Sequence, residues 1–212
     1  MPGSHTMQPF RIFADTAVPI DIANCDTDQI IPARYLRRAE DDPDFPTFLL
    51  HDLRYDQDGH ETSFIYNREP FRSARIIVAD VNWGCGSSRE HAVMALNANG
   101  IRAVIAPSIG DIHYTNCIRN GVLPVILDKE VCDKLRAQLH ESPGAEIAID
   151  LQEQSVTGPD QVNYSFAIDE FDKYRLLHGL DDIGLTLEYG EQIDAFARAY
   201  GERRAWTAVR NP

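Results

Sequence analysis

The chain contains 212 residues, of which 43% are hydrophobic and 25% charged, as is usual for a globular protein. Its 20 basic and 33 acidic residues give a formal net charge of −13, which argues against nucleic acid and anionic membranes as partners. No apolar run reaches the roughly 18 residues of a membrane span, and residues 1–8 lack the apolar core of a signal peptide. The four cysteines show no C-x-x-C spacing, and without an export signal they indicate a reducing, cytoplasmic setting.

The first part of the chain is predicted to contain one strand followed mostly by loops. The apolar strand Val18–Ala23 ends in the turn-rich Asn24-Cys25-Asp26-Thr27-Asp28. The acidic segment 41–46 contains two prolines and indicates a loop, and Phe48–Leu53 is expected to be a short helix. For the chain as a whole we expect a flexible lead-in at residues 1–9, one domain over residues 10–200 and a loose tail at residues 201–212.

From Ser73 onward, strand and helix patterns alternate. The predicted strands are Ile76–Val81, Ile101–Ala106 and Val122–Leu127, and the predicted helices are Ser88–Asn99, Asp111–Asn120 and Lys129–Glu141. This alternation predicts right-handed crossovers and a mainly parallel sheet. Beyond Gly144, Glu146–Val156 and Val162–Ile168 alternate apolar and polar residues, which indicates an antiparallel pair, and helices at Asp169–His178 and Asp182–Tyr200 end the chain. The pattern is that of a single α/β domain with a β-rich supplement.

The most informative segment is Gly84-Cys85-Gly86-Ser87-Ser88-Arg89-Glu90-His91, which follows a buried strand and opens a helix. Two glycines allow a sharp turn and a close approach to a ligand. Two hydroxyl groups and a guanidinium lie where a helix N-terminus binds anions. The segment lacks the spacing of a hydrolase elbow, a dinucleotide-binding fingerprint or a P-loop. A small anionic molecule is therefore the predicted ligand.

Each of these residues also has a structural interpretation. Ser87 and Glu90 have the spacing of a capping box, so Ser87 could serve only to cap the helix. The carboxylates of Asp26 and Asp28 could form a solvated turn, or one of them could reach the same crevice and pair with Arg89. Arg37 precedes the acidic loop and could belong to a solvated face or to a mobile specificity loop.

His113 and Asn116 are predicted to lie near the start of a helix on the crevice side, where a lone histidine is more often structural than catalytic. His5, His51, His60, His140 and His178 show no metal-ligand spacing. We therefore expect no metal site in this chain.

Taken together, these segments resemble the small subunits of 3-isopropylmalate dehydratase in the aconitase superfamily. The resemblance covers about residues 10–189. The matching stretches are Asn24–Pro32, Gly84–His91, Val104–Ile112, Asn120–Val125 and Gly179–Leu187. The resemblance implies a three-layer β/β/α swivelling domain with a mainly parallel sheet and a C-terminal strand and helix supplement.

The resemblance also implies a function. Such a subunit binds no cofactor itself, and a separate large subunit carries a [4Fe–4S] cluster. The pair interconverts 2- and 3-isopropylmalate through isopropylmaleate in leucine biosynthesis. By resemblance, Ser87 is the base, Arg89 and Ser88 bind the dicarboxylate hydroxy-acid substrate, and Asp28 and Arg37 contribute to the substrate site.

Two alternatives remain open at this point. The chain could be the small subunit of a related dehydratase acting on citramalate, dimethylmalate or homoaconitate, because such relatives share the serine motif. It departs from many relatives at Trp83, where phenylalanine is frequent, and at Val93-Met94, where Pro-Trp is frequent. It could also be a non-enzymatic module in which the glycine-rich corner holds a phosphate or a carboxylate.

Overall fold

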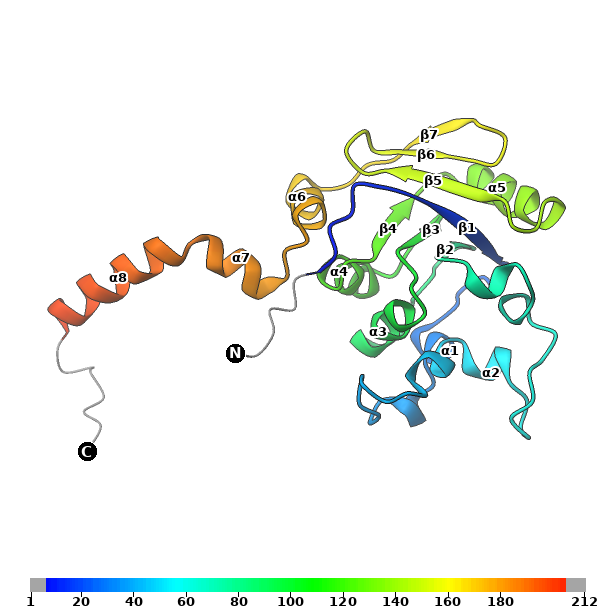
Figure 1. Ribbon diagram of the computed structural model, residues 1–212, viewed down its shortest axis with the longest axis horizontal. Coiled ribbons are helices and arrows are strands. Elements are labelled where there is room, and N and C mark those ends of the chain that lie inside the picture. The colour runs from blue at the N-terminus through cyan, green and yellow to red at the C-terminus, as the bar shows by residue number, and fades with distance from the viewer. Residues whose placement is uncertain (1–6, 205–212) are drawn as a thin grey trace.

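The computed structural model describes residues 7–204, which form one seven-stranded sheet with helices on both faces and a helical arm at the C-terminus (Figure 1). Most of the predicted lead-in and tail, residues 1–6 and 205–212, lies outside the described residues. The strands are β1 (Ile12–Ile20), β2 (Ile76–Ala79), β3 (Ala103–Ala106), β4 (Leu123–Ile126), β5 (Glu146–Asp150), β6 (Ser155–Thr157) and β7 (Asn163–Ser165). The α-helices are α1 (Thr27–Ile30), α2 (His51–Arg54), α3 (Glu90–Ala98), α4 (Asp111–Arg119), α5 (Lys129–Glu141), α6 (Glu170–His178), α7 (Asp182–Glu188) and α8 (Gly190–Arg203).

The sheet has a parallel half and an antiparallel half that share strand β1. The strand order is β4-β3-β2-β1-β5-β6-β7. The second part of β1, Ala17 to Ile20, pairs in parallel with β2, and β2–β3 and β3–β4 are also parallel. The first part of β1, Ile12 to Thr16, pairs antiparallel with β5, and β6 and β7 continue in antiparallel order. The predicted α/β fold with a β supplement is confirmed.

Each face of the sheet is covered by its own hydrophobic core. Alternate residues of β2 point to opposite faces, so Ile77 joins the core beneath α3 whereas Ile76 and Val78 join the core beneath α5. Because helices cover both faces, all four residues of β2 and of β3 are buried. This double burial accounts for the continuous apolar runs of these strands in the sequence.

The structure differs from the predicted elements at two strands, one through long-range pairing and one through a local turn. Strand β1 begins at Ile12 rather than Val18, since its first half is stabilised by pairing with β5. The predicted strand Glu146–Val156 is two strands, because the Asp150 carboxylate accepts the backbone N–H of Glu153 and Gln154 adopts a φ of 51°. Helix α5 has the predicted bounds.

The last two helices form an arm that extends away from the sheet (Figure 1). No residue of α7 or α8 is buried, and α8 continues to Arg203, into the range predicted as tail. The base of the arm is fixed to α6, where Arg175 donates to the Asp182 carboxylate at 2.6 Å and to the Leu180 carbonyl at 3.0 Å. Within the described residues, the structure contains no helix of the length and apolarity required to cross a lipid bilayer.

Candidate functional site

Three segments that follow parallel strands meet at one edge of the sheet. After β1, the Thr27 N–H donates to the Cys85 carbonyl at 2.9 Å, and the Gly84 N–H donates to the Cys25 carbonyl at 2.7 Å. After β3, the Gly110 N–H donates to the Trp83 carbonyl at 2.8 Å. The carboxyl ends of neighbouring parallel strands share an edge, which explains why these three segments can pair there. The predicted convergence is therefore observed, and the main chain holds it together.

The turn before Ser87 depends on glycine. Gly84 has a φ of 68° and Gly86 a φ of 93°, in the left-handed region that favours glycine. A Cβ atom on Gly84 would lie 2.3 Å from Cδ2 of His113, so the ring occupies the space that a side chain would need. Gly84 is therefore required both by the backbone conformation and by the packing of His113.

Ser87 and Ser88 lie exposed just before α3. Helix α3 begins at Glu90, its N-cap is Arg89, and no side chain caps it. The Glu90 carboxylate instead accepts a hydrogen bond from the Asn120 amide at 3.1 Å. The capping-box interpretation of Ser87 is therefore wrong, and the predicted start of this helix at Ser88 is two residues early. The first N–H groups of α3 keep the capacity to bind an anion.

Arg89 joins the serine turn to the segment after β1. Its Nη1 atom donates to the Asp28 carboxylate and, at 3.1 Å, to the Ile31 carbonyl. Hydrogen bonds from Arg89 and from the Ala33 backbone N–H hold the pKa of the Asp28 carboxyl below its ordinary value. Among the residues that the structure describes, Nε and Nη2 of Arg89 have no partner. Asp28 thus fixes one edge of the guanidinium and leaves another free for a ligand.

A cavity of about 260 Å³ lies at this junction. It is lined by Thr27, Gly84, Cys85, Gly86, Ser87, Arg89, Gly110, Asp111, Ile112 and His113. Thr27 lines the cavity beside Ser87, and its hydroxyl donates to the Ser87 carbonyl at 2.8 Å, which fixes the serine backbone. The volume suits one small molecule with a few polar groups, rather than a nucleotide.

His113 is part of the cavity wall, although the sequence favoured a structural role for it. Its side chain is only 2% exposed, and burial lowers its pKa to about 4, so the ring is neutral near pH 7. Within the described part of the chain, neither ring nitrogen has a hydrogen-bond partner. Asn116, one helical turn later, is also buried. The position after a strand was the only sequence signal for His113.

Arg37 does not line the cavity. It is exposed and follows a short 3₁₀ helix, Ala33–Tyr35, and among the described residues it has no ion pair. Neighbouring Tyr35 is fixed, since its ring stacks on Phe48 with centroids 4.1 Å apart and its hydroxyl lies 3.0 Å from Nε2 of His51. A role for Arg37 in substrate binding remains a prediction.

The cysteines do not form a cluster-binding set within residues 7–204. Cys25, Cys117 and Cys132 are buried, and Cys85 is half-buried at the cavity. Burial raises the pKa of Cys25 and of Cys132 to about 12 and raises the pKa of Cys117 as well. Cys132 lies in the core on the opposite face of the sheet from Cys25 and Cys117, so the four thiols are not gathered at one point as cluster ligands are.

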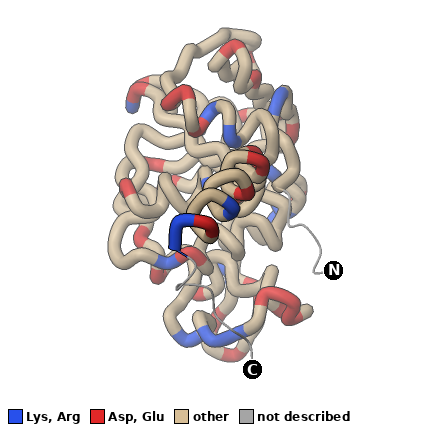
Figure 2. Tube along the Cα trace, turned by 90° about the vertical axis from the view of Figure 1, so that its left-hand side faces the viewer, with Lys and Arg blue, Asp and Glu red and all other residues tan. Residues whose placement is uncertain are grey.

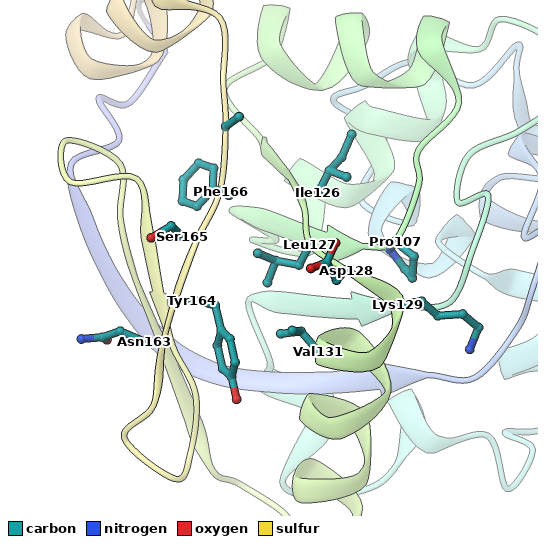
Figure 3. A pocket seen from close by; sticks show the side chains of 11 residues that line it. Pro107, Ile126, Leu127, Asp128, Lys129, Val131, Asn163, Tyr164, Ser165 and Phe166 are labelled. Carbon is teal, nitrogen blue, oxygen red and sulfur yellow. The ribbon is translucent and has the colours of Figure 1, made fainter.

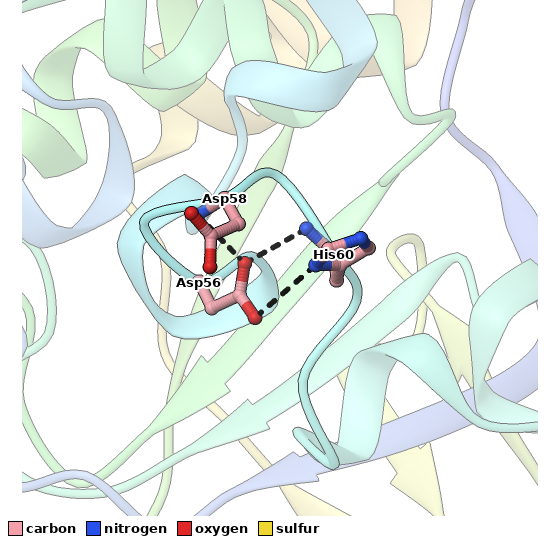
Figure 4. Close-up of side chains that lie close together, drawn as sticks. All are labelled: Asp56, Asp58 and His60. Carbon is pink, nitrogen blue, oxygen red and sulfur yellow. Dashed lines mark hydrogen bonds and ion pairs between the residues drawn. The ribbon is translucent and has the colours of Figure 1, made fainter.

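Two other surface features are weaker candidates for the functional site. A hollow of about 550 Å³ lies between the start of α5 and β7 (Figure 3). None of the five predicted site residues, all of them within the described chain, lines it. The other is an exposed group of Asp56, Asp58 and His60 with potential ligand atoms within 4.8 Å of one another (Figure 4). Here Asp56 accepts the backbone N–H groups of Asp58 and His60, as in an ordinary polar turn.

The fold, with a serine turn at the shared edge of parallel strands, can now be compared with known protein families. The family described as the aconitase C-terminal domain matches residues 7–130, and a second family described as LeuD_N matches residues 133–170. The domain is therefore of the aconitase C-terminal type. More narrowly, the chain belongs to the family of 3-isopropylmalate dehydratase small subunits.

Individual relatives carry this narrower assignment. The 3-isopropylmalate dehydratase small subunit of Dinoroseobacter shibae is 43% identical, over 94% of this chain and 100% of its own length. The one from Leptospira interrogans is 44% identical, over 94% of this chain and 98% of its own. A crystal structure of 3-isopropylmalate dehydratase from Methanocaldococcus jannaschii is similar, with a TM-score of 0.61 and 26% identity, over 87% of this chain and 98% of the other.

Proposed function

We propose that this chain is the small subunit of a 3-isopropylmalate dehydratase and contributes the proton-transfer and carboxylate-binding half of its active site. The cavity that brings Ser87 and Arg89 together is the observation that carries the proposal. The names of the relatives support the choice of substrate. The reaction removes water from 2-isopropylmalate to give isopropylmaleate, and adds it back with the opposite placement to give 3-isopropylmalate.

In this reaction Ser87 removes the proton from the carbon next to a substrate carboxylate. A serine alkoxide is a poor choice of base in water, because its negative charge needs stabilisation. The uncapped N-terminus of α3 and the adjacent Arg89 supply positive potential close to the Ser87 side chain. The local field thus favours the oxyanion form of the serine.

Arg89 binds the substrate carboxylate through the edge of its guanidinium that Asp28 leaves free. A planar guanidinium forms paired hydrogen bonds with a carboxylate, and a fixed orientation reduces the entropy lost on binding. Asp28 acts by orienting Arg89, and the lowered pKa of the Asp28 carboxyl preserves the ion pair at acid pH values where an ordinary aspartate would be protonated. We assign to Ser88, exposed beside Ser87, a further hydrogen bond to the substrate.

The other half of the site comes from the large subunit. We assign to it the [4Fe–4S] cluster, which would supply the Lewis acid for the departing hydroxyl group. This assignment agrees with the thiols of the present chain, which are divided between the two faces of the sheet. An isolated small subunit is therefore expected to have no activity.

The first experiment measures hydratase activity of the chain alone and mixed anaerobically with its large subunit. The substrates are 3-isopropylmalate, citramalate and citrate, and the ultraviolet absorbance of the unsaturated intermediate reports turnover. Activity only in the mixture, highest on 3-isopropylmalate, is the expected result. Preference for another hydroxy acid would support the assignment of the half-site but change the assigned substrate. Absence of activity in a stable complex with an intact cluster would contradict the proposal.

The second experiment replaces the base. Ser87→Ala in the assembled complex is expected to lower turnover by roughly 10²- to 10⁴-fold, the usual contribution of a general base, without loss of assembly. Ser63→Ala is the matched control, because Ser63 is exposed and lies outside the cavity. Near wild-type turnover of the Ser87→Ala complex would refute the assignment of Ser87 as base.

A further inference from the structure

The C-terminal arm presents an apolar surface that nothing in the described chain covers. Across α7 and α8, six large apolar side chains are between 40% and 70% exposed. They are Ile183, Leu187, Tyr189, Ile193, Phe196 and Tyr200. Single exposed apolar residues are common on protein surfaces, whereas a contiguous set along one element marks an interaction site.

Four of these residues lie along one side of α8. In and just before α8, the apolar positions 189, 193, 196 and 200 are separated by four, three and four residues, so they form a single stripe. The charged residues Glu191, Asp194, Arg198 and Glu202 lie on the opposite side of the same helix. Figure 2, which views the molecule from the arm's side, shows charges of both signs along it. Helix α8 is therefore amphipathic although it does not pack against the sheet.

The exposed apolar surface of the whole arm is of the size found in protein–protein contacts. The six side chains expose on the order of 800 Å², which is about what each partner contributes to a standard interface. The spacing is also that of an amphipathic helix that inserts its anchors into a groove of a partner. Asp182–Arg203 contains five acidic and two basic residues, so the complementary groove is apolar with a basic rim.

Exposed apolar residues are also found on the elements that join the arm to the cavity. Helix α6, at the base of the arm, packs against α4, and α6 carries the exposed rings of Phe171 and Tyr174. At the start of α4, Ile112 is 53% exposed and lines the cavity that contains Ser87. The arm, α6 and the rim of the cavity therefore each carry exposed apolar side chains, and α6 joins the arm to α4.

We propose that Asp182–Arg203 is a docking arm for the large subunit of the dehydratase, which receives the stripe in an apolar groove with a basic rim. The identity of this partner rests on the proposed function, since the large subunit must cover the cavity, which the exposed Ile112 lines, to complete the site. A second copy of this chain could pair arm to arm, but such a dimer would leave Ile112 and the cavity rim open. The large subunit covers both.

The test measures affinity between the full chain and the purified large subunit by isothermal titration calorimetry under anaerobic conditions. The double variant Ile193→Asp/Phe196→Asp places two carboxylates in the stripe, and Ala195→Asp places one on the charged side of the same helix as the control. We expect at least a tenfold rise in Kd for the double variant, with unchanged turnover at saturating small subunit, and no change for Ala195→Asp. Circular dichroism checks that the helix is retained in each variant.

The outcomes separate this inference from the proposed function. Unchanged affinity of the double variant would overturn the docking arm, as would loss of a dimer of the isolated chain without any effect on the large subunit. A complex that forms through the arm but dehydrates none of the hydroxy acids would refute the proposed function and leave the docking arm standing. An active complex whose affinity is unchanged by the double variant would support the proposed function and overturn the docking arm.

Discussion

The two halves of the sheet differ in what they offer to function. Strands β1 to β4 are parallel, so the segments after β1, β2 and β3 leave the sheet at one edge and pair with one another there. Strands β5 to β7 are antiparallel, so successive connections leave at opposite edges. None of the five predicted site residues, all of them described, lies in this second half. Strand direction thus decides where side chains from distant segments can gather.

After Ser87→Ala, the variant with the largest expected effect at the shared edge is Arg89→Lys. A lysine keeps the charge but loses the planar fork that binds both Asp28 and a carboxylate. We expect kcat/KM to fall roughly 10- to 100-fold, as for loss of a charged hydrogen bond. Steady-state kinetics of the complex measure it, and Arg119→Lys, exposed at the end of α4, is the control. Unchanged KM and turnover would remove Arg89 from the substrate site.

A smaller effect on turnover is expected from Gly84→Ala, which tests the shared edge itself. The new Cβ atom would overlap the His113 ring at 2.3 Å, and the φ of 68° is unfavourable for alanine. We expect turnover to fall roughly tenfold and the free energy of unfolding to fall by about 3 kcal/mol.

Gly59→Ala provides the control for that strain. Gly59 has a φ of 82°, but no atom lies within 4 Å of the point that an alanine Cβ would occupy, so only backbone strain of about 1 kcal/mol is expected there. Chemical denaturation of both variants separates the two contributions. Equal destabilisation would mean that the contact with His113 is relieved at no cost.

The smallest effect on turnover is expected in the antiparallel half. Ile149 of β5 is fully buried, and Ile149→Ala should lower the free energy of unfolding by about 2–5 kcal/mol. Turnover should stay unchanged at temperatures where the variant is folded. Ile12→Ala is the control, because it removes the same side-chain atoms at a position that is 73% exposed and so leaves no buried cavity. Reduced turnover in a folded Ile149→Ala complex would contradict the claim that only the parallel half of the sheet supports the site.

Much of the fold could be predicted because its signals are local. The alternation of apolar strands with amphipathic helices predicted the parallel half, and Lys129–Glu141 is a helix with those bounds. Contacts between distant segments were not predictable in this way. Residues 12–16 form a strand because β5, more than 130 residues later, pairs with them. The sequence also predicted one continuous helix over Asp182–Tyr200. The structure instead contains two helices, α7 and α8, which are separated at Tyr189.

The candidate site was predictable to a similar extent. The rule that parallel strands end at one edge allowed Asp26 or Asp28 to pair with Arg89, and the family resemblance singled out Asp28. The structure shows the ion pair between Asp28 and Arg89. The Ser-x-x-Glu spacing gave no means of deciding whether Ser87 caps the helix, because a cap and a site use the same residues. The position of His113 against Gly84 depends on packing between two segments, for which no local pattern exists.

The main-chain hydrogen bonds that join the three segments of the shared edge have an evolutionary consequence. They link Gly84 to Cys25, Thr27 to Cys85 and Gly110 to Trp83 through backbone atoms alone. Substitution of a side chain on these segments therefore leaves the links in place, provided that the glycines are kept. A frame of this kind lets the walls of the cavity change during descent while the positions of Ser87 and Arg89 persist. New substrates can then be acquired without rebuilding the fold.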